Sequence, residues 1–224
     1  MKKILSIKKP IYAFIDASNL FYDGEKSLGW KIDYKKLADY LKDKYKVRRI
    51  YYYGGIEIHN YRYSSLDYKP IDLSRLITHL EDMLRNDRLS ETEILILGIH
   101  IKRAKFYKRL GEFGYNLQLK PVKIYHDENG NTVKKANCDV DMTFDLMKYL
   151  SKYSGVVVLS GDGDFVPVLS YLKHKGRSVT ILARPERTAK EIKKLAGSNF
   201  RDFHYLREIL KYDNKSTNKR KGPV

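Results

Sequence analysis

Two aspartates separated by a single glycine follow a β-branched apolar run. The run Val156–Leu159 is typical of a buried strand, and Asp162 and Asp164 come shortly after it, where a helix is expected to begin. Carboxylates held close together repel each other and lose solvation, and a bound cation removes that penalty. The pattern therefore indicates a metal site at the end of this strand.

Two more acidic residues are expected at the same place. Asp16 ends the apolar run Ile11–Ile15, and Asp139 lies at the start of an expected helix. Because the carboxyl ends of parallel strands meet at one edge of a sheet, these carboxylates should converge there with Asp162 and Asp164. Asn19 adds an amide within reach of that edge. Hard oxygen ligands of this kind suit Mg²⁺ or Mn²⁺.

Each acid alone also fits a commoner structural role. Asp139 and Asp164 could simply cap helices, and Asp16 could be a turn residue at a strand end. Four acids at one predicted edge of a chain with net charge +17 favour a metal site instead. A calcium loop beginning at Asp162 is excluded because its twelfth position is Lys173 rather than glutamate.

Strands and helices are expected to alternate along most of the chain. Strands are predicted at 11–15, 47–53, 93–101, 115–125, 156–159, 179–183 and 200–203, and helices at 33–44, 71–85, 102–113, 138–150, 165–174 and 188–196. This order predicts an α/β fold, a three-layer α/β/α sandwich with a mainly parallel central sheet. Residues 1–210 would form one domain with an insertion within 56–114, and residues 211–224 a basic, disordered tail.

Three local details complete the prediction. Gly54 and Gly55 should end the second strand, and an Asn-Gly pair at 129–130 favours a two-residue hairpin turn. In the helix 138–150, Val140, Phe144 and Met147 are expected to face the core.

Charge and composition narrow the class of partner. The chain has 224 residues, with 44 Lys and Arg against 27 Asp and Glu, and such a basic surface attracts nucleic acid first. A composition rich in lysine for other reasons is the alternative. The single cysteine, Cys138, excludes an internal disulfide and fits a cytoplasmic protein. No apolar segment approaches the ~20 residues of a membrane span.

Three segments together resemble the NYN domain, a PIN-like nuclease family that includes LabA-like bacterial proteins. They are residues 14–20 (FIDASNL), 134–141 (KKANCDVD) and 159–167 (LSGDGDFVP), and the resemblance extends over about residues 10–205. It implies a PIN-like, Rossmannoid fold and Mg²⁺- or Mn²⁺-dependent hydrolysis of RNA phosphodiester bonds. In that family pattern Asp16, Asp139, Asp162 and Asp164 match the metal-binding acids, and Asn19 matches a polar helper.

The predicted function is thus a metal-dependent ribonuclease, with endonucleolytic cleavage favoured. Ser160 and Asn19 would orient water or phosphate. Arg184 and Arg187, after the strand 179–183, would contact the substrate backbone, although ordinary surface arginines are an equal alternative.

Two other functions stay open at this point. One is a non-catalytic RNA-binding module with the same fold, and the other is a metal-dependent hydrolase of small phosphate esters. RNA is the expected partner, a membrane is not, and the oligomeric state is open, a homodimer included.

Overall fold

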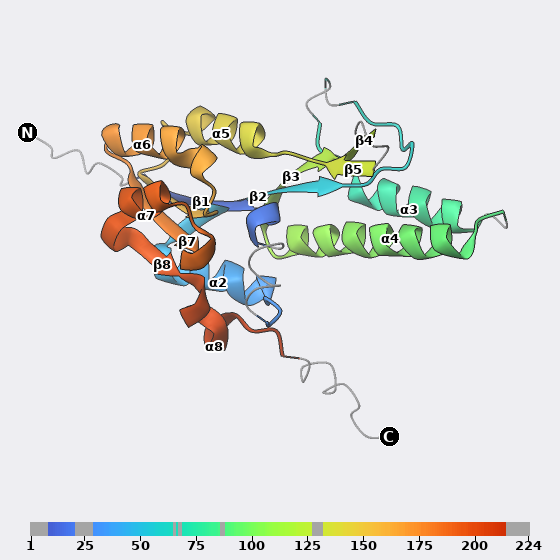
Figure 1. Cartoon of the computed structure of the whole chain (residues 1–224), viewed down its shortest axis with the longest axis horizontal. Coiled ribbons are helices and arrows are strands. Elements are labelled where there is room, and N and C mark those ends of the chain that lie inside the picture. Colours follow the sequence, from blue (N-terminus) through green and yellow to red (C-terminus); the bar gives the residue numbers. More distant parts are fainter. Residues whose placement is uncertain are drawn as a thin grey trace, which may run out of the picture.

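A six-stranded parallel sheet forms the centre of the molecule (Figure 1). The computed structural model describes residues 9–20, 29–64, 66, 69–85, 88–126 and 132–213. The strand order is β3-β2-β1-β6-β7-β8, and each neighbouring pair is parallel. The strands are β1 (Ile11–Asp16), β2 (Val47–Ile56), β3 (Tyr115–Pro121), β6 (Gly155–Leu159), β7 (Ser178–Ala183) and β8 (Phe200–Asp202).

Helices cover both faces of this sheet. On one face lie α2 (Tyr34–Tyr45), α3 (Leu73–Leu84), α4 (Glu91–Glu112) and α8 (Arg207–Leu210); on the other lie α5 (Asp139–Lys148), α6 (Val166–His174) and α7 (Lys190–Ala196) (Figure 1). Alternate side chains of β1 enter the two cores: Ala13 and Ile15 pack with α2, whereas Tyr12 and Phe14 pack with α5. The predicted three-layer α/β/α sandwich is confirmed.

Helix α2 begins where the sequence predicts a helix, next to Asp33. The Asp33 carboxylate caps α2 by accepting hydrogen bonds from the backbone N–H groups of Lys35 and Lys36. At the other end, Lys46 adopts a left-handed conformation with φ of 56° and turns the chain into β2. A cap with a side-chain acceptor is a local signal, so this helix was predictable to within a residue.

The segment 93–101 is helical, which corrects the predicted strand there. It forms a single 22-residue helix, α4, together with the predicted helix 102–113. Ser90 and Glu93 form a capping box, in which each side chain accepts a hydrogen bond from the other residue's backbone N–H. Leu97, Ile101 and Ala104 fall at helical spacing and are buried. The alternating Leu and Ile residues imitated a strand because short apolar runs fit both periods.

Two boundaries and one orientation also differ from the prediction. Strand β2 continues through Gly54 and Gly55 to Ile56, and the strand predicted at 115–125 is divided into β3 and β4 (Lys123–His126). Helix α5 buries Met142 and Leu146 and exposes the three residues expected in the core: Val140, Phe144 and Met147.

The phase of α5 has a tertiary cause. Asp145, on the same helix, is buried, and its carboxylate accepts a hydrogen bond of 3.0 Å from the Tyr53 hydroxyl at the end of β2. This contact turns the polar Asp145 toward the sheet and leaves the apolar stripe outside.

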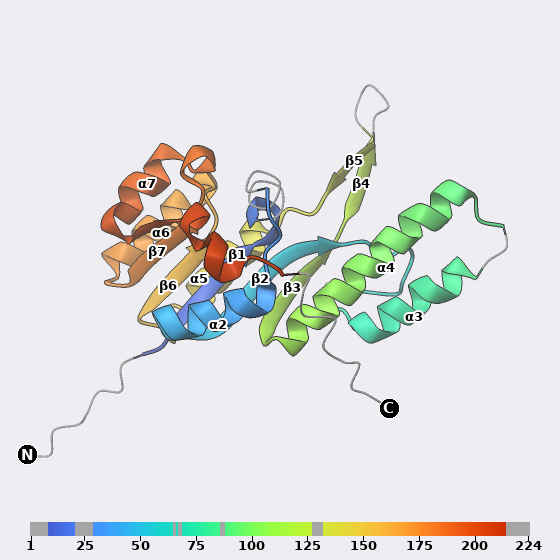
Figure 2. The same ribbon diagram turned by 90° about the horizontal axis from the view of Figure 1, so that it is seen from below.

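The hairpin predicted around the Asn-Gly pair is confirmed by the pairing of the two strands on either side of it. β4 pairs antiparallel with β5 (Thr132–Lys135), and this ribbon extends beyond the sheet (Figure 2). The Asn-Gly turn itself, like the tail beyond Asp213, lies outside the described residues. In the described part of the chain, no helix combines the length and apolar character needed to cross a bilayer.

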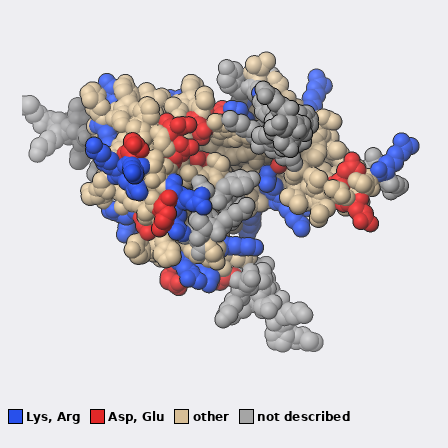
Figure 3. All heavy atoms as spheres, viewed as in Figure 1, with Lys and Arg blue, Asp and Glu red and all other residues tan. Residues whose placement is uncertain are grey.

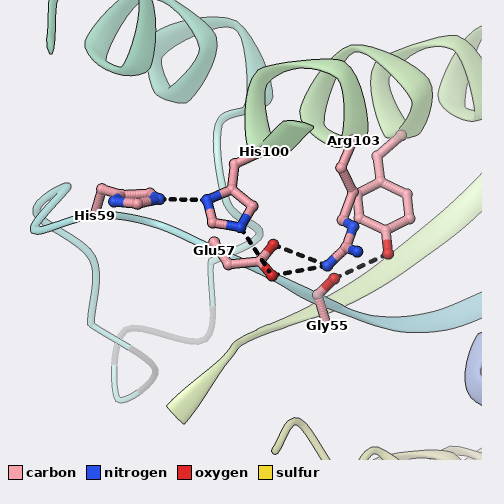
Figure 4. A network of polar contacts seen from close by, with 6 residues as sticks. Gly55, Glu57, His59, His100 and Arg103 are labelled. Atoms are coloured by element: carbon pink, nitrogen blue, oxygen red, sulfur yellow. Dashed lines mark hydrogen bonds and ion pairs between the residues drawn. The ribbon is translucent and has the colours of Figure 1, made fainter. Parts of the chain in front are cut away.

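The helices α3 and α4 form a hairpin that projects from the sheet (Figures 1 and 2). A polar network joins α4 to the segment after β2 (Figure 4). Arg103 makes two hydrogen bonds to the Glu57 carboxylate, of 2.8 and 3.0 Å, and the His100 ring lies between Glu57 (3.5 Å) and the His59 ring (2.5 Å). The Tyr107 hydroxyl donates to the Gly55 carbonyl, so the hairpin is held at its root.

The root network should contribute measurably to stability. In Glu57→Ala, Arg103 and the buried His100 lose their shared acceptor, and the free energy of unfolding should fall by about 2 kcal/mol. Urea denaturation measures this change. The matched control is Asp82→Ala, which breaks the exposed Asp82–Arg85 pair on α3 and should cost less than about 0.5 kcal/mol. Equal costs for the two variants would contradict a structural role for the network.

Candidate metal centre

Three aspartates meet at the carboxyl edge of the sheet. Asp139 opens α5, Asp162 follows β6, and Asp164 lies in the short helix η3 (Gly163–Phe165). One carboxylate oxygen from each residue lies within 4.8 Å of the other two. Asp139 and Asp162 are half-buried and Asp164 is exposed, so the cluster is open to solvent on one side. We call these three residues the aspartate cluster.

Local hydrogen bonds set the position of each acid. The Asp162 carboxylate caps η3 by accepting the backbone N–H of Asp164 at 2.9 Å, which holds the pair in one turn. The backbone N–H of Asp139 donates to the Asn137 side chain at 2.8 Å. Asn137 therefore helps to position the start of α5, a role that its sequence position did not reveal.

Asp16 lies beside the aspartate cluster but is not one of its three members. It ends β1 and is only 6% exposed. Its carboxylate accepts hydrogen bonds from the Ser18 backbone and hydroxyl (2.9 and 2.6 Å), the Asn19 backbone (3.3 Å) and the Ser160 hydroxyl (3.3 Å). The structure thus brings three of the four predicted acids together and holds the fourth next to them.

Asn19 and Ser160 join the loops that follow β1 and β6. The Asn19 side-chain oxygen accepts the backbone N–H of Gly161 at 3.0 Å. The Ser160 hydroxyl donates to Asp16 and accepts the backbone N–H of Asp162 at 3.2 Å, and Ser160 is 2% exposed. These contacts suit the orientation of carboxylates, and contact of either residue with substrate stays a prediction.

Gly161 is required by a close approach between two loops. A Cβ atom added there would lie 2.6 Å from the Thr188 hydroxyl and 3.0 Å from the Arg187 carbonyl. The Gly161 carbonyl also accepts the backbone N–H of Ala189 at 3.0 Å. The loop after β7 therefore packs directly on the loop that carries Asp162.

Arg184 and Arg187 lie on that same neighbouring loop. Both line a small pocket together with Asn19 and Phe203, so they lie at the predicted edge of the sheet. Arg184 also donates from Nε to Glu186 at 3.0 Å, and Arg187 is exposed. Their proposed contact with a substrate backbone stays a prediction.

The amino-acid sequence matches a known protein family over most of the length of the chain. A family model described as the NYN domain matches residues 10–205. The chain belongs to the NYN domain family. The resemblance predicted from residues 14–20, 134–141 and 159–167 is thereby confirmed.

Individual relatives of this NYN domain are distant. The "Low amplitude and bright protein LabA" of Synechococcus elongatus (strain ATCC 33912 / PCC 7942 / FACHB-805) is 24% identical over 201 residues, which cover 88% of this chain and 85% of LabA. VPA0982 of Vibrio parahaemolyticus RIMD 2210633, a protein of unknown function, superposes with a TM-score of 0.58 at 19% identity, covering 90% of this chain and 96% of that protein. This second likeness supports the fold alone.

A weaker structural likeness links the chain to the T5 D15 protein, which was co-crystallized with metal ions. The TM-score is 0.43 at 14% identity, and the match covers 82% of this chain and 59% of that protein.

Electrostatics in this NYN domain favour a bound cation. Burial raises the pKa of Asp139, and the neighbouring charges of Asp16, Asp162 and Asp164 raise it further, while the Asn137 contact lowers it. Burial also raises the pKa of Asp16, against hydrogen bonds that lower it. The ionised carboxylates therefore repel one another, and a divalent cation bound to their hard oxygens would remove that repulsion. The residues fit such an ion.

Removing one charge from the aspartate cluster should stabilise the metal-free fold. At pH 7.5 in EDTA, Asp139→Asn should raise the Tm by about 2–4 °C, the shift that ~1 kcal/mol produces in a chain of this size. The gain is small because Asp139 is half-exposed and solvent screens the repulsion. It should disappear as the pH falls through the raised pKa of Asp139, because the parent carboxyl is then neutral too.

Differential scanning fluorimetry measures the Tm of the parent and of Asp139→Asn, with and without Mn²⁺. Mn²⁺ should raise the Tm of the parent more than that of the variant. Asp141→Asn is the matched control, because Asp141 shares the first turn of α5 but pairs with Lys120 at 2.7 Å. Asp141→Asn should lower the Tm or leave it unchanged, because a carboxylate in the first turn of a helix is stabilising. A gain in Tm for both variants in EDTA would contradict repulsion within the aspartate cluster as the cause.

Proposed function

We propose that this NYN domain is a metal-dependent ribonuclease that hydrolyses RNA phosphodiester bonds. The observation that carries the proposal is the convergence of Asp139, Asp162 and Asp164 within 4.8 Å. Mg²⁺ or Mn²⁺ is the proposed ion because carboxylate oxygens suit these hard cations. Membership of the NYN family and the net charge of +17 support a nucleic-acid substrate.

The surface charge of the molecule agrees with this substrate class. Acidic side chains gather near α5 and α6, and Lys and Arg side chains lie around them (Figure 3). Basic groups at the periphery would attract the phosphate backbone, while the acidic centre would repel it without an ion. This arrangement makes binding at the centre dependent on the metal.

Each side chain has a role in the proposed reaction. Asp139, Asp162 and Asp164 would hold the ion, and Asp16 adds a buried negative charge next to them. When bound, a divalent cation lowers the pKa of water and stabilises charge on the leaving oxygen. Asn19, whose side chain holds the Gly161 backbone, keeps the two loops together during the reaction.

Asp162→Asn should abolish metal-dependent cleavage and preserve the fold. The amide keeps an oxygen that can cap η3 but lacks the negative charge, and we expect at least about a 100-fold loss of rate. The measurement is gel analysis of labelled RNA with Mn²⁺, and EDTA should stop the parent. Asp202→Asn is the matched control, because Asp202 caps the short helix Phe203–Leu206 in the same way at the end of β8.

Two results would overturn the proposed activity, and a third would overturn the proposed site. RNA binding with no cleavage by the parent under any divalent ion would indicate a non-catalytic RNA-binding module. Release of phosphate from small esters, with intact RNA, would indicate a small-phosphoester hydrolase. Cleavage by Asp162→Asn at the parental rate would exclude the aspartate cluster as the site.

Arg187 offers a separate test of the substrate path. If this exposed side chain contacts one phosphate, Arg187→Ala should lower the slope of log affinity against log salt by about one. Fluorescence anisotropy with labelled RNA measures the slope, in the Asp162→Asn background so that the RNA stays intact. Arg75→Ala, a change of an exposed arginine on α3, should leave the slope as it is. An unchanged slope for Arg187→Ala would remove this residue from the path.

A further inference from the structure

The first half of α4 carries an exposed apolar cluster outside the metal centre. Ile94, Leu95, Ile96 and Ile99 are between 37% and 66% exposed, and we call them the α4 tip patch. Soluble proteins seldom leave several large aliphatic side chains in contact with water on neighbouring turns. The patch lies on the hairpin that projects from the sheet (Figure 2).

The patch is distinct from the side of α4 that packs on the protein. The buried residues Leu97, Ile101 and Ala104 form the inner stripe of the helix. Leu95 and Ile99 are one turn apart and fall on the opposite side, because positions four apart share a face. A partner helix could therefore pack there without displacing any contact within the domain.

Charge along α4 changes sign across the patch. Glu91 and Glu93 lie in its first turn, whereas Lys102 and Lys108 follow in its second half, together with Lys105, which already pairs with Glu81 on α3. Two such helices placed side by side in the same direction would face like charges. In opposite directions, the acidic turn of each helix faces the basic half of the other.

We propose that two copies of this chain associate through the α4 tip patch, with their α4 helices antiparallel. A two-fold axis midway between Leu95 and Ile99 places Leu95 of one copy against Ile99 of the other. The same axis, which relates position 91 to position 103, brings Glu91 next to Lys102 of the other copy, so apolar and charged contacts are satisfied together. A two-fold interface uses one self-complementary surface twice, which is the commonest symmetry of soluble oligomers.

Other occupants fit this surface less well. Nucleic acid would meet four aliphatic side chains beside Glu91 and Glu93, which repel phosphate. An anionic membrane surface would meet the same two glutamates, whereas membrane-surface helices carry basic residues beside their apolar face. Self-association alone uses both the acidic turn and the basic half. It does not depend on the proposed nuclease function.

Sedimentation velocity on the full chain, at about 1–100 µM, tests the proposal. The parent should be a dimer that dissociates on dilution. Leu95→Ser and Ile99→Ser should each raise the dissociation constant by about tenfold or more. Phe144→Ser is the control, because Phe144 is an equally large exposed side chain (62%) on α5, and its loss should leave the constant as it is.

A charge exchange tests the antiparallel geometry. Glu91→Lys and Lys102→Glu should each weaken the dimer, and the double variant should recover most of the parental affinity. Circular dichroism confirms that α4 stays folded in each variant. A parent protein that is monomeric at ~100 µM would overturn the proposal. The same holds if the monomeric parent protein binds to anionic vesicles. A dimer that Leu95→Ser leaves intact, or a double variant weaker than both single ones, would also overturn it.

Discussion

The crowding of carboxylates at the end of a buried parallel sheet is the constraint on which the rest of this structure depends. Burial raises the pKa of Asp16, and burial together with the neighbouring carboxylates raises the pKa of Asp139, so the fold must hold these groups against an electrostatic cost. Backbone N–H groups and the Ser18 and Ser160 hydroxyls supply part of the compensation. A cation would supply the remainder, which ties metal binding to the stability of these loops.

Contacts between neighbouring loops fix the positions of the carboxylates in the aspartate cluster. Gly161 allows the loop after β7 to approach within van der Waals distance, and the Asn19 side chain bridges the loops after β1 and β6. On the other side, the Tyr53–Asp145 hydrogen bond fixes the rotation of α5. Four separate strands, β1, β2, β6 and β7, thus determine where the aspartate cluster lies, and a shift in any one of them would separate its oxygens.

The sequence predicted the parts that depend on local patterns. The β-branched run Val156–Leu159, the start of a helix at residue 33 and the two acids at 162 and 164 are short-range signals, and the strands and the edge of the sheet followed from them. It did not predict the phase of α5, because the Tyr53–Asp145 contact joins residues far apart in the chain. The first half of α4 was missed for a different reason: its Leu and Ile run fits both periods, and only the Ser90–Glu93 capping box decides between them.

The segment 93–101, which was predicted as a strand, also carries the α4 tip patch. The wrong prediction and the exposed patch have the same cause. A helix that is apolar on all sides over two turns imitates a buried strand, because a single domain rarely leaves such residues in water. In this molecule the Glu57–Arg103 contacts hold the root of the hairpin, and among the described residues the α4 tip patch stays exposed. The apolar run of α4 therefore fits two surfaces on one helix: an inner side that packs on this domain and an exposed outer side where the second copy is proposed to pack.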